Sequence, residues 1–375
     1  MRADHTDHTP ARSPAPASSG WERGEAYPRV AVFRALQLGD LLCAVPALRA
    51  LRHALPTGHI TLIGLPWARD FARRIGYVDD FIEFPGFPGM PEREPDLLGL
   101  PDFFAATRER HFDLAIQMHG SGGLTNPLVA RLEAEHMAGF FIPGAWCPDP
   151  DLFIPWPEDL PEARRLLALA EFLGAPARGE HSELPLYPEE QDDFAELRHQ
   201  LPVGAKGYVC IHPGARLASR RWSPERFARV ADGLAADGFS IVLTGTRDEA
   251  PILSAVREAM AAPAIDLAGH TSLGTLAALV AEARLVVCND TGMSHVAAAV
   301  GTPSVVVACG SDPERWRPLD QARHRVLWHP MACRPCGFEH CPTGHECAAG
   351  VEAEAVVLAA RQLLSASPEK RHVAP

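Results

Sequence analysis

Residues 285–308, LVVCNDTGMSHVAAAVGTPSVVVA, contain the pattern that decides the fold. Leu285–Cys288 and Ser304–Ala308 are short apolar runs typical of buried strands, and Ser294–Val300 between them favours a helix. Strand, helix and strand in this order predict a βαβ unit of a parallel sheet. Ligands of such sheets bind beyond the carboxyl ends of the strands, so we expect chemistry at Asn289–His295.

The same alternation runs through most of the 375-residue chain. Predicted strands cover residues 30–36, 59–64, 81–84, 113–118, 207–212, 239–245 and 264–267, and predicted helices cover 41–51, 67–75, 103–110, 161–173, 250–260, 273–283 and 352–364. A further helix starts with Ser223-Pro224-Glu225, a combination favoured at helix starts, and ends before Gly238. Thr271 or Ser272 is the expected cap of the helix at 273–283. Strands alternating with helices predict an α/β fold built on parallel sheets.

An acidic, Pro-broken stretch between residues 148 and 202 separates two such series. We therefore predict two doubly wound, Rossmann-like domains that face a central cleft, at residues 28–185 (with the linker) and 186–365. The polar ends at residues 1–27 and 366–375 are predicted to be disordered tails.

The composition excludes several classes of protein. The net charge of −12 argues against a protein that coats nucleic acid, because such proteins need a clustered basic surface. No run reaches the roughly 18 apolar residues that span a membrane, and the N-terminus lacks the apolar core of a secretory signal. We expect a cytoplasmic protein without a transmembrane segment.

Two strand-end loops carry candidate acid or base groups. Gly39-Asp40 follows the first predicted strand, where a glycine allows close backbone approach and the helix dipole stabilises an ionised carboxylate. Glu249 follows the strand at 239–245, where a carboxylate can accept hydrogen bonds from ribose hydroxyls. For both Asp40 and Glu249, capping of the next helix is the competing interpretation.

Two other loops carry candidate anion sites. Arg216, Arg220 and Arg221 follow the strand at 207–212 and suit a phosphate or carboxylate, with a solvated basic loop as the alternative. Asp290–His295 precedes a helix whose first backbone N–H groups can bind an anion. An acid and a histidine at one strand end are poorly explained by core packing, so here the functional interpretation is favoured.

These segments together resemble glycosyltransferase family 9, the lipopolysaccharide heptosyltransferases. The resemblance covers about Arg29 to Leu364 and is carried by Gly39-Asp40 with Pro46-Ala47-Leu48, by Trp222–Phe227, by Asn289–His295 and by the cysteine segment that starts at Cys333. It implies the GT-B architecture, in which two Rossmann-like domains enclose the active site. It also implies inverting transfer of a heptose from ADP-heptose to a lipopolysaccharide inner-core acceptor.

The resemblance also implies roles for individual residues. Asp40 matches the general base, which we expect to be ionised near the ordinary pKa of about 4. Arg220 matches the basic residue on the donor phosphates, where the family commonly has Lys, and Glu249 matches the ribose-binding acid. Asp290, Thr291, Gly292 and His295 match the donor-binding loop. The implied partners are a nucleotide-sugar donor and a lipid-linked glycan acceptor at the inner membrane surface, which places the enzyme in the cytoplasm or peripherally on that surface.

The cysteine segment allows two interpretations. Cys333, Cys336, Cys341 and Cys347 could form a tetrahedral zinc site, but their spacing is tighter than that of two separated Cys-x2-Cys pairs. A metal-free loop of thiols is favoured, and no cofactor is expected to be required, because Arg220 and the helix start after Asp290 can stabilise the leaving group.

Other functions stay open at this point. A GT-B enzyme with another nucleotide-sugar donor, a nucleotide-sugar epimerase and a catalytically silent nucleotide-binding module share most of these features. Asp40 in the first domain fits activation of an acceptor better than epimerisation. A structure in which Asp40 and Asp290 face one cleft would favour the transferase.

Overall fold

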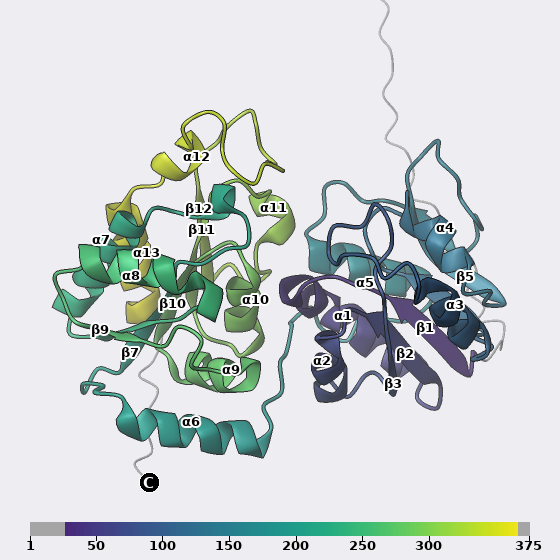
Figure 1. Ribbon diagram of the computed structural model, residues 1–375, viewed down its shortest axis with the longest axis horizontal. Coiled ribbons are helices and arrows are strands. Elements are labelled where there is room, and N and C mark those ends of the chain that lie inside the picture. The colour runs from purple at the N-terminus through teal and green to yellow at the C-terminus, as the bar shows by residue number, and fades with distance from the viewer. Residues whose placement is uncertain (1–26, 367–375) are drawn as a thin grey trace, which may run out of the picture.

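The computed structural model describes residues 27–366, which form two parallel six-stranded sheets flanked by helices (Figure 1). The strand orders are β3-β2-β1-β4-β5-β6 and β12-β11-β10-β7-β8-β9, so both sheets are doubly wound. The tails predicted at 1–27 and 366–375 lie outside the described residues, except for Tyr27 and Ala366. Tyr27 is buried, with its ring 5.8 Å from that of His136, and Ala366 ends the last helix, so the prediction for these two residues was wrong.

The first half of the chain forms the first sheet and its helices. Its elements are β1 (Arg29–Phe33), α1 (Leu38–Ala54), β2 (His59–Gly64), α2 (Ala68–Arg74), β3 (Asp80–Glu83), α3 (Leu100–Arg108), β4 (Leu114–Gln117), α4 (Thr125–Ala130), β5 (His136–Phe141), β6 (Phe153–Pro155) and α5 (Glu162–Phe172). The strand order reverses between β1 and β4, so the loops after these two strands lie at the switch point where ligands of doubly wound sheets bind.

The second half repeats this topology. Its elements are α6 (Pro188–Gln200), β7 (Tyr208–His212), η1 (Ala218–Arg220), α7 (Pro224–Ala236), β8 (Ser240–Leu243), η2 (Arg247–Glu249), α8 (Ala250–Ala259), β9 (Ala264–Asp266), α9 (Leu273–Glu282), β10 (Leu285–Asn289), α10 (Gly292–Ala299), β11 (Ser304–Ala308), α11 (Pro313–Trp316), β12 (His324–Trp328), α12 (Glu346–Ala349) and α13 (Ala353–Ala366). Here the order reverses between β7 and β10. The loops with Arg220 and Asp290 follow these two strands.

Local sequence explains most of these elements. All five residues of β10 and of β11 are buried, as expected for strands covered by helices on both faces. Ser272 is the cap of α9, where its hydroxyl accepts a hydrogen bond from the Thr275 N–H (3.1 Å). The segment that joins the two halves runs from the end of α5 to the start of α6. Helix α5 packs against α1 of the first half, and α6 packs against α9 of the second.

The sequence pattern missed several elements at the margins. The short edge strand β6 falls in a Pro-rich segment, and the edge strand β12 carries exposed and charged residues. The helix predicted at 41–51 begins earlier, at Leu38, because Gln37 and Asp40 form a capping box at its start.

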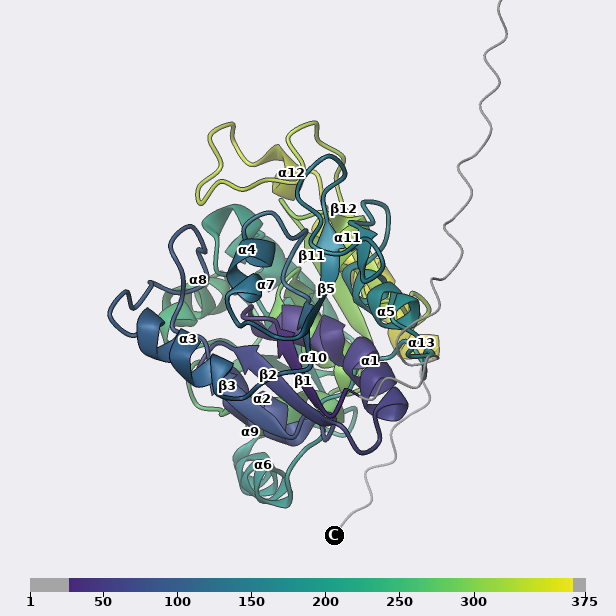
Figure 2. The same ribbon diagram turned by 90° about the vertical axis from the view of Figure 1, so that its right-hand side faces the viewer.

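The two halves meet along their helix starts. In Figure 1, α10 of the second half faces α1 of the first, and the packing of these two helices is confirmed by their contacts. Figure 2 views the molecule from the side of the first half, with α1 in front of α10. The carboxyl ends of both sheets therefore open toward one region between the halves.

Candidate active site

Asp40 lies at the third position of α1, half-buried at the switch point of the first sheet. Its Oδ2 accepts a hydrogen bond from the Gln37 N–H (3.3 Å), and within residues 27–366 its Oδ1 accepts none. Burial raises the pKa of Asp40, and the field of Glu162 adds to this rise, while Arg34 opposes it. The expectation of an ordinary pKa was therefore wrong, because the protein removes part of the water from this carboxyl. Asp40 caps its helix and still presents one free oxygen.

A buried arginine fixes the backbone of Asp40. Arg34, at the end of β1, is fully buried, and its Nε donates to the Asp40 carbonyl (2.9 Å). Its Nη1 donates to the carbonyl of Met118, which ties the ends of β1 and β4 together. Its Nη2 lies 3.1 Å from Oε1 of Glu162, whose side chain is 1% exposed. Burial of a charge is costly unless it is paired, so this arrangement holds α1 in one position.

The donor loop predicted at Asp290–His295 sits at the start of α10. Thr291 has an extended backbone and α10 begins at Gly292, so the first N–H groups of this helix point out of its start. The Asp290 residue is half-buried; burial raises its pKa, while the nearby Ser311 hydroxyl, His295, Arg220 and Arg334 oppose the rise.

Unpaired polar atoms concentrate at this loop. Nine buried side-chain nitrogen or oxygen atoms lack a hydrogen-bond partner within residues 27–366, and five of them belong to the second half of the chain. These five are Nε of Arg220, Oδ2 of Asp290, Oγ1 of Thr291, Oγ of Ser311 and Nε of Arg334. Buried polar atoms are normally paired, so a cluster without protein partners is suited to bind a polar ligand.

Two arginines supply positive charge to the donor loop. Arg220 ends the turn η1 and donates from Nη2 to the Cys336 carbonyl (3.1 Å). Arg334 donates from Nη1 to the Ser311 carbonyl (2.8 Å) and from Nη2 to the carbonyl of Ala308 at the end of β11. Each guanidinium is anchored on one side and keeps an unpaired Nε, whose N–H group is free to donate a hydrogen bond to an anionic ligand.

Glu249 is the last residue of the turn η2, which follows β8. Its Oε2 accepts hydrogen bonds from the Thr246 N–H (2.8 Å) and hydroxyl (3.2 Å), which is the capping arrangement. The same oxygen is 4.0 Å from Nε2 of His212, at the end of β7. Glu249 therefore caps its turn and also faces the neighbouring switch-point strand.

The loops of the two halves touch at Gly39. A Cβ atom built on Gly39 would lie 2.8 Å from Cδ2 of His295 and 3.4 Å from the Cα of Gly292. Nδ1 of His295 is 3.6 Å from Sγ of Cys43, and only 8% of the histidine is exposed. The structure thus brings the Asp40 and Asp290 loops together and places His295 in the contact between the halves.

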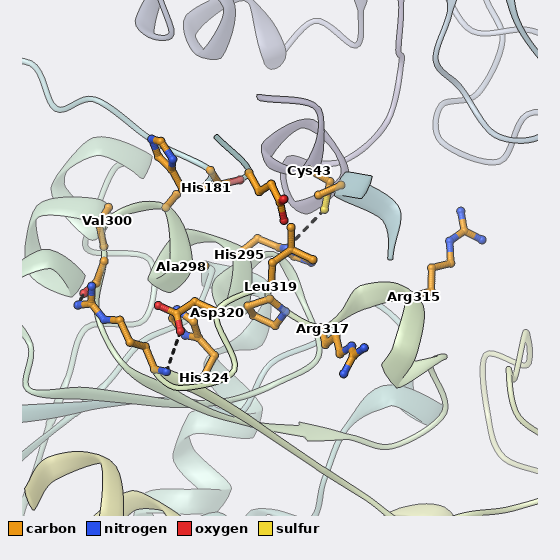
Figure 3. Close-up of a pocket in the computed structure, with 17 residues that line it drawn as sticks. Cys43, His181, His295, Ala298, Val300, Arg315, Arg317, Leu319, Asp320 and His324 are labelled. Carbon is orange, nitrogen blue, oxygen red and sulfur yellow. Dashed lines mark hydrogen bonds between the residues drawn. The ribbon is translucent and has the colours of Figure 1, made fainter. Parts of the chain in front are cut away.

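A cavity of about 610 Å³ lies behind this contact (Figure 3). Its walls include Cys43, His295 and Val300, and it reaches His324 at the start of β12. Neither Asp40 nor Asp290 lines it. Of the predicted site residues, His295 therefore borders the cavity, whereas Asp40 and Asp290 do not.

The cysteine segment braces the loop of Arg220. The Cys336 N–H donates to the Gly310 carbonyl (2.7 Å), and the Ser219 N–H donates to the Glu339 carbonyl (2.9 Å). The tetrahedral arrangement of Cys333, Cys336, Cys341 and Cys347 is not formed: in the described part of the chain no three His, Cys, Asp or Glu residues are grouped so that they could hold a metal ion. All nine cysteines are free thiols.

Comparison with known proteins identifies the family. A family model described as glycosyltransferase family 9 (heptosyltransferase) matches residues 102–346. The chain belongs to glycosyltransferase family 9. It is therefore a glycosyltransferase.

Relatives of this glycosyltransferase are heptosyltransferases. Lipopolysaccharide heptosyltransferase 2 of Escherichia coli K12 is 26% identical over 311 residues, which cover 77% of this chain and 85% of that protein. Lipopolysaccharide heptosyltransferase 3 of the same organism is 34% identical, but the match spans only 34% of this chain and 39% of that protein.

Solved structures of the family share the fold. A family 9 glycosyltransferase from Veillonella parvula DSM 2008 has a TM-score of 0.77 at 23% identity and covers 92% of this chain and 99% of its own. ADP-heptose lps heptosyltransferase II of E. coli has a TM-score of 0.66 at 20% identity over 90% of this chain and 99% of its own. The two facing sheets are thus the GT-B architecture expected from the sequence.

Sequence reasoning missed four charged residues at or near the candidate site, which are Arg34, Glu162, Arg315 and Arg334. Arg34 offered a signal, since a charged residue inside the apolar run at 30–36 needs a buried partner. Glu162 and Arg315 offered none, because their pairing depends on how the two halves meet. Arg334 lies between Cys333 and Cys336, and this segment was interpreted only as a possible metal site or a loop of thiols.

Proposed function

We propose that this glycosyltransferase transfers a heptose from ADP-heptose to a lipopolysaccharide inner-core acceptor with inversion at the anomeric carbon. The names of its relatives support the acceptor class. A heptosyltransferase of E. coli solved with ADP-2-deoxy-2-fluoro heptose, which has a TM-score of 0.61 at 19% identity, supports the donor class.

The contact of Gly39 with Gly292 and His295 carries this proposal. It places the start of α1, with its carboxylate, next to the start of α10, with its N–H groups and buried unpaired atoms. An acceptor on the side of Asp40 and a donor on the side of Asp290 would then meet between the two helix starts. An epimerase needs no such division into two sides.

The mechanism follows from the two sides. Asp40 accepts the proton of the attacking acceptor hydroxyl through its free Oδ1, and the raised pKa makes it a stronger base than an ordinary Asp. The acceptor oxygen forms a bond to the anomeric carbon while the bond from that carbon to the diphosphate oxygen breaks. The bonding electrons leave with ADP, and the configuration inverts because attack and departure occur on opposite faces.

The second half of the chain stabilises the negative charge that develops on the departing diphosphate. Arg220, Arg334 and the start of α10 offer fixed positive charge and N–H donors there. These groups supply the stabilisation that a divalent cation supplies in other transferases, so we infer that no metal is required. Asp290 and Thr291 hydrogen-bond the sugar or phosphate oxygens, and Glu249 accepts from the ribose hydroxyls.

The acceptor class bears on where the enzyme works. No helix within residues 27–366 is long and apolar enough to cross a membrane. A lipid-linked acceptor is reached from the inner membrane surface, so we infer peripheral action there by the cytoplasmic enzyme.

Calorimetry and a transfer assay test this function. Wild type and Asp40→Asn are titrated with ADP-heptose and with other nucleotide sugars, and heptose transfer to inner-core oligosaccharide is followed by mass spectrometry in EDTA. Asp40→Asn, which keeps the side chain's size, is expected to bind ADP-heptose as wild type does and to lose about 10²- to 10⁴-fold in kcat. Full turnover by Asp40→Asn refutes the base, preference for another nucleotide sugar refutes the donor, and binding without transfer by wild type indicates a silent module.

A further inference from the structure

A second carboxylate, Glu92, lies in the long loop between β3 and α3. Its side chain is 16% exposed, and its Oε2 is buried without a hydrogen-bond partner in the described part of the chain. Asp40 of the first half and Arg216 of the second both act on its charge, although burial has the larger effect and raises its pKa. Glu92 also lies 3.8 Å from His119, which is hydrogen-bonded to the Ala35 N–H in the loop that leads to Asp40, so it belongs to the Asp40 side, where the acceptor is expected.

His119 is the neighbour of Glu92, and its hydrogen bonding defines which nitrogen carries the proton. Nδ1 of His119 accepts a hydrogen bond from the Ala35 N–H (3.3 Å), in the loop that leads to Asp40. Burial lowers the pKa of His119 to about 3, so the ring is neutral with its proton on Nε2. Nε2 thus presents a donor toward Glu92.

The backbone and the ring of His119 are both held in place by neighbouring groups. The His119 carbonyl accepts hydrogen bonds from Nε2 of Gln117 (2.6 Å) and from the Thr125 hydroxyl (2.9 Å). The His119 ring stacks on Phe33, with centroids 5.5 Å apart. Fixed groups of this kind lower the entropic cost of binding a ligand.

The separation of the two side chains allows one hydroxyl group, placed beside the line that joins them, to contact both. Nε2 of His119 is 3.8 Å from Oε1 of Glu92, which is too long for a hydrogen bond, so a donor and an acceptor face each other without pairing. A hydroxyl accepts from the first and donates to the second. A ligand carboxylate would instead meet the negative charge of Glu92.

We propose that Glu92 and His119 form an acceptor subsite beside Asp40 that binds a hydroxyl of a neutral sugar and disfavours a carboxylate-bearing one. This inference rests on the proposed transferase function and names its acceptor more closely. Glu92 is then a specificity-determining residue of the acceptor side.

Two variants separate the hydrogen bond from the charge. Glu92→Leu removes both, whereas Glu92→Gln keeps a hydrogen-bonding side chain of the same size and removes the charge. Glu94→Gln is the matched control, since Glu94 is exposed in the same loop. Each protein, saturated with ADP, is titrated in a calorimeter with an inner-core oligosaccharide ending in a neutral heptose and with one ending in a carboxylate sugar, and transfer is assayed separately.

Wild type is expected to prefer the neutral oligosaccharide. Glu92→Leu is expected to weaken its binding about 10- to 100-fold, as for loss of a hydrogen bond to a charged group, and Glu92→Gln to lose most discrimination against the carboxylate sugar. The affinity of the Glu92 variants for ADP, and the affinity of Glu94→Gln for both oligosaccharides, stay at wild-type values. Glu92 variants that bind both oligosaccharides as wild type does, a wild-type preference for the carboxylate sugar, or no binding of either overturn the subsite. Glu92-dependent binding without transfer counts against the transferase function alone.

Discussion

Arg315 of α11 forms an ion pair with Glu162 of α5 across the two halves of the molecule, with Nε 3.0 Å from Oε2 of the carboxylate. The same carboxylate also pairs with Arg34, which holds the backbone of Asp40. One buried acid thus links the start of α1 to the second domain. The position of the proposed base and the docking of the two domains are therefore coupled.

Removing this acid is expected to destabilise the protein. Glu162→Gln leaves Arg34 buried without an ionic partner, which typically costs about 3–5 kcal/mol. Arg315→Gln is expected to cost less, because 30% of its side chain is exposed. Thermal unfolding followed by circular dichroism measures both, with Arg317→Gln as a control whose partner Glu314 is 65% exposed. Equal melting temperatures for Glu162→Gln and wild type would contradict the coupling.

The pH dependence of stability has a defined sign at this acid. Burial by itself raises the pKa of Glu162, but Arg34, Arg315 and Arg165 outweigh it and leave the pKa below its usual value. The ionised form therefore stabilises the folded state above the unfolded pKa of about 4.3, and this contribution is lost as the pH falls through the lower folded value. In melting curves from pH 7 downward, the difference between wild type and Glu162→Gln should shrink below about pH 4.

Gly39→Ala is expected to disturb the contact between the two domains without unfolding either of them. The added Cβ would stand 2.8 Å from Cδ2 of His295, so the buried His295 ring, or α10 with it, must shift. A displacement of about 1 Å between reacting groups can cost on the order of 100-fold, and we expect kcat/KM to fall by that order while the melting temperature changes little. Gly337→Ala is the control, because nothing lies within 4 Å of its Cβ position. Unchanged turnover would show that this contact does not set the distance between donor and acceptor.

The alternation of strands and helices could be predicted from the sequence, and so could the loops at the switch points. Asp40, Arg220 and Asp290 could be selected because parallel strands present their carboxyl ends at one edge. The linkage of Glu162 to Arg34 and Arg315 could not be predicted, since it depends on the angle at which two domains dock. The raised pKa of Asp40 could not be predicted either, because it reflects how much water the folded protein removes from the carboxyl.

The acid limb of the pH–rate profile reports on Asp40. A base must be ionised, so activity falls as the pH drops through its pKa, and burial places this pKa above the ordinary value of about 3.9. Arg315 opposes the rise, so Arg315→Gln should move the acid limb to higher pH. Steady-state kcat from pH 4 to 8 tests this, with Arg317→Gln as control and circular dichroism to verify folding. An acid limb that Arg315→Gln leaves in place would remove Asp40 as the titrating group.

Arg334 is the residue of the donor side whose role is most open to test. Its guanidinium is held by the carbonyl of Ala308 at the end of β11 and by that of Ser311 in the following loop, and its Nε has no partner within residues 27–366. Loss of a charge-assisted hydrogen bond to the diphosphate costs about 1.5–3 kcal/mol, so Arg334→Met should weaken ADP binding about 10- to 100-fold. Calorimetry with ADP measures this directly.

A purely structural role of Arg334 makes different predictions. Arg334→Lys keeps the charge but loses the fork that reaches both carbonyls, so it should retain part of the ADP affinity if the charge binds the diphosphate. ADP binding should also weaken with salt in wild type, and weaken less steeply in Arg334→Met, because one screened interaction is missing. Arg229→Met, on the far helix α7 with 55% of its side chain exposed, is the control. A salt dependence identical in wild type and Arg334→Met would mean that Arg334 supports the loop without contacting the donor.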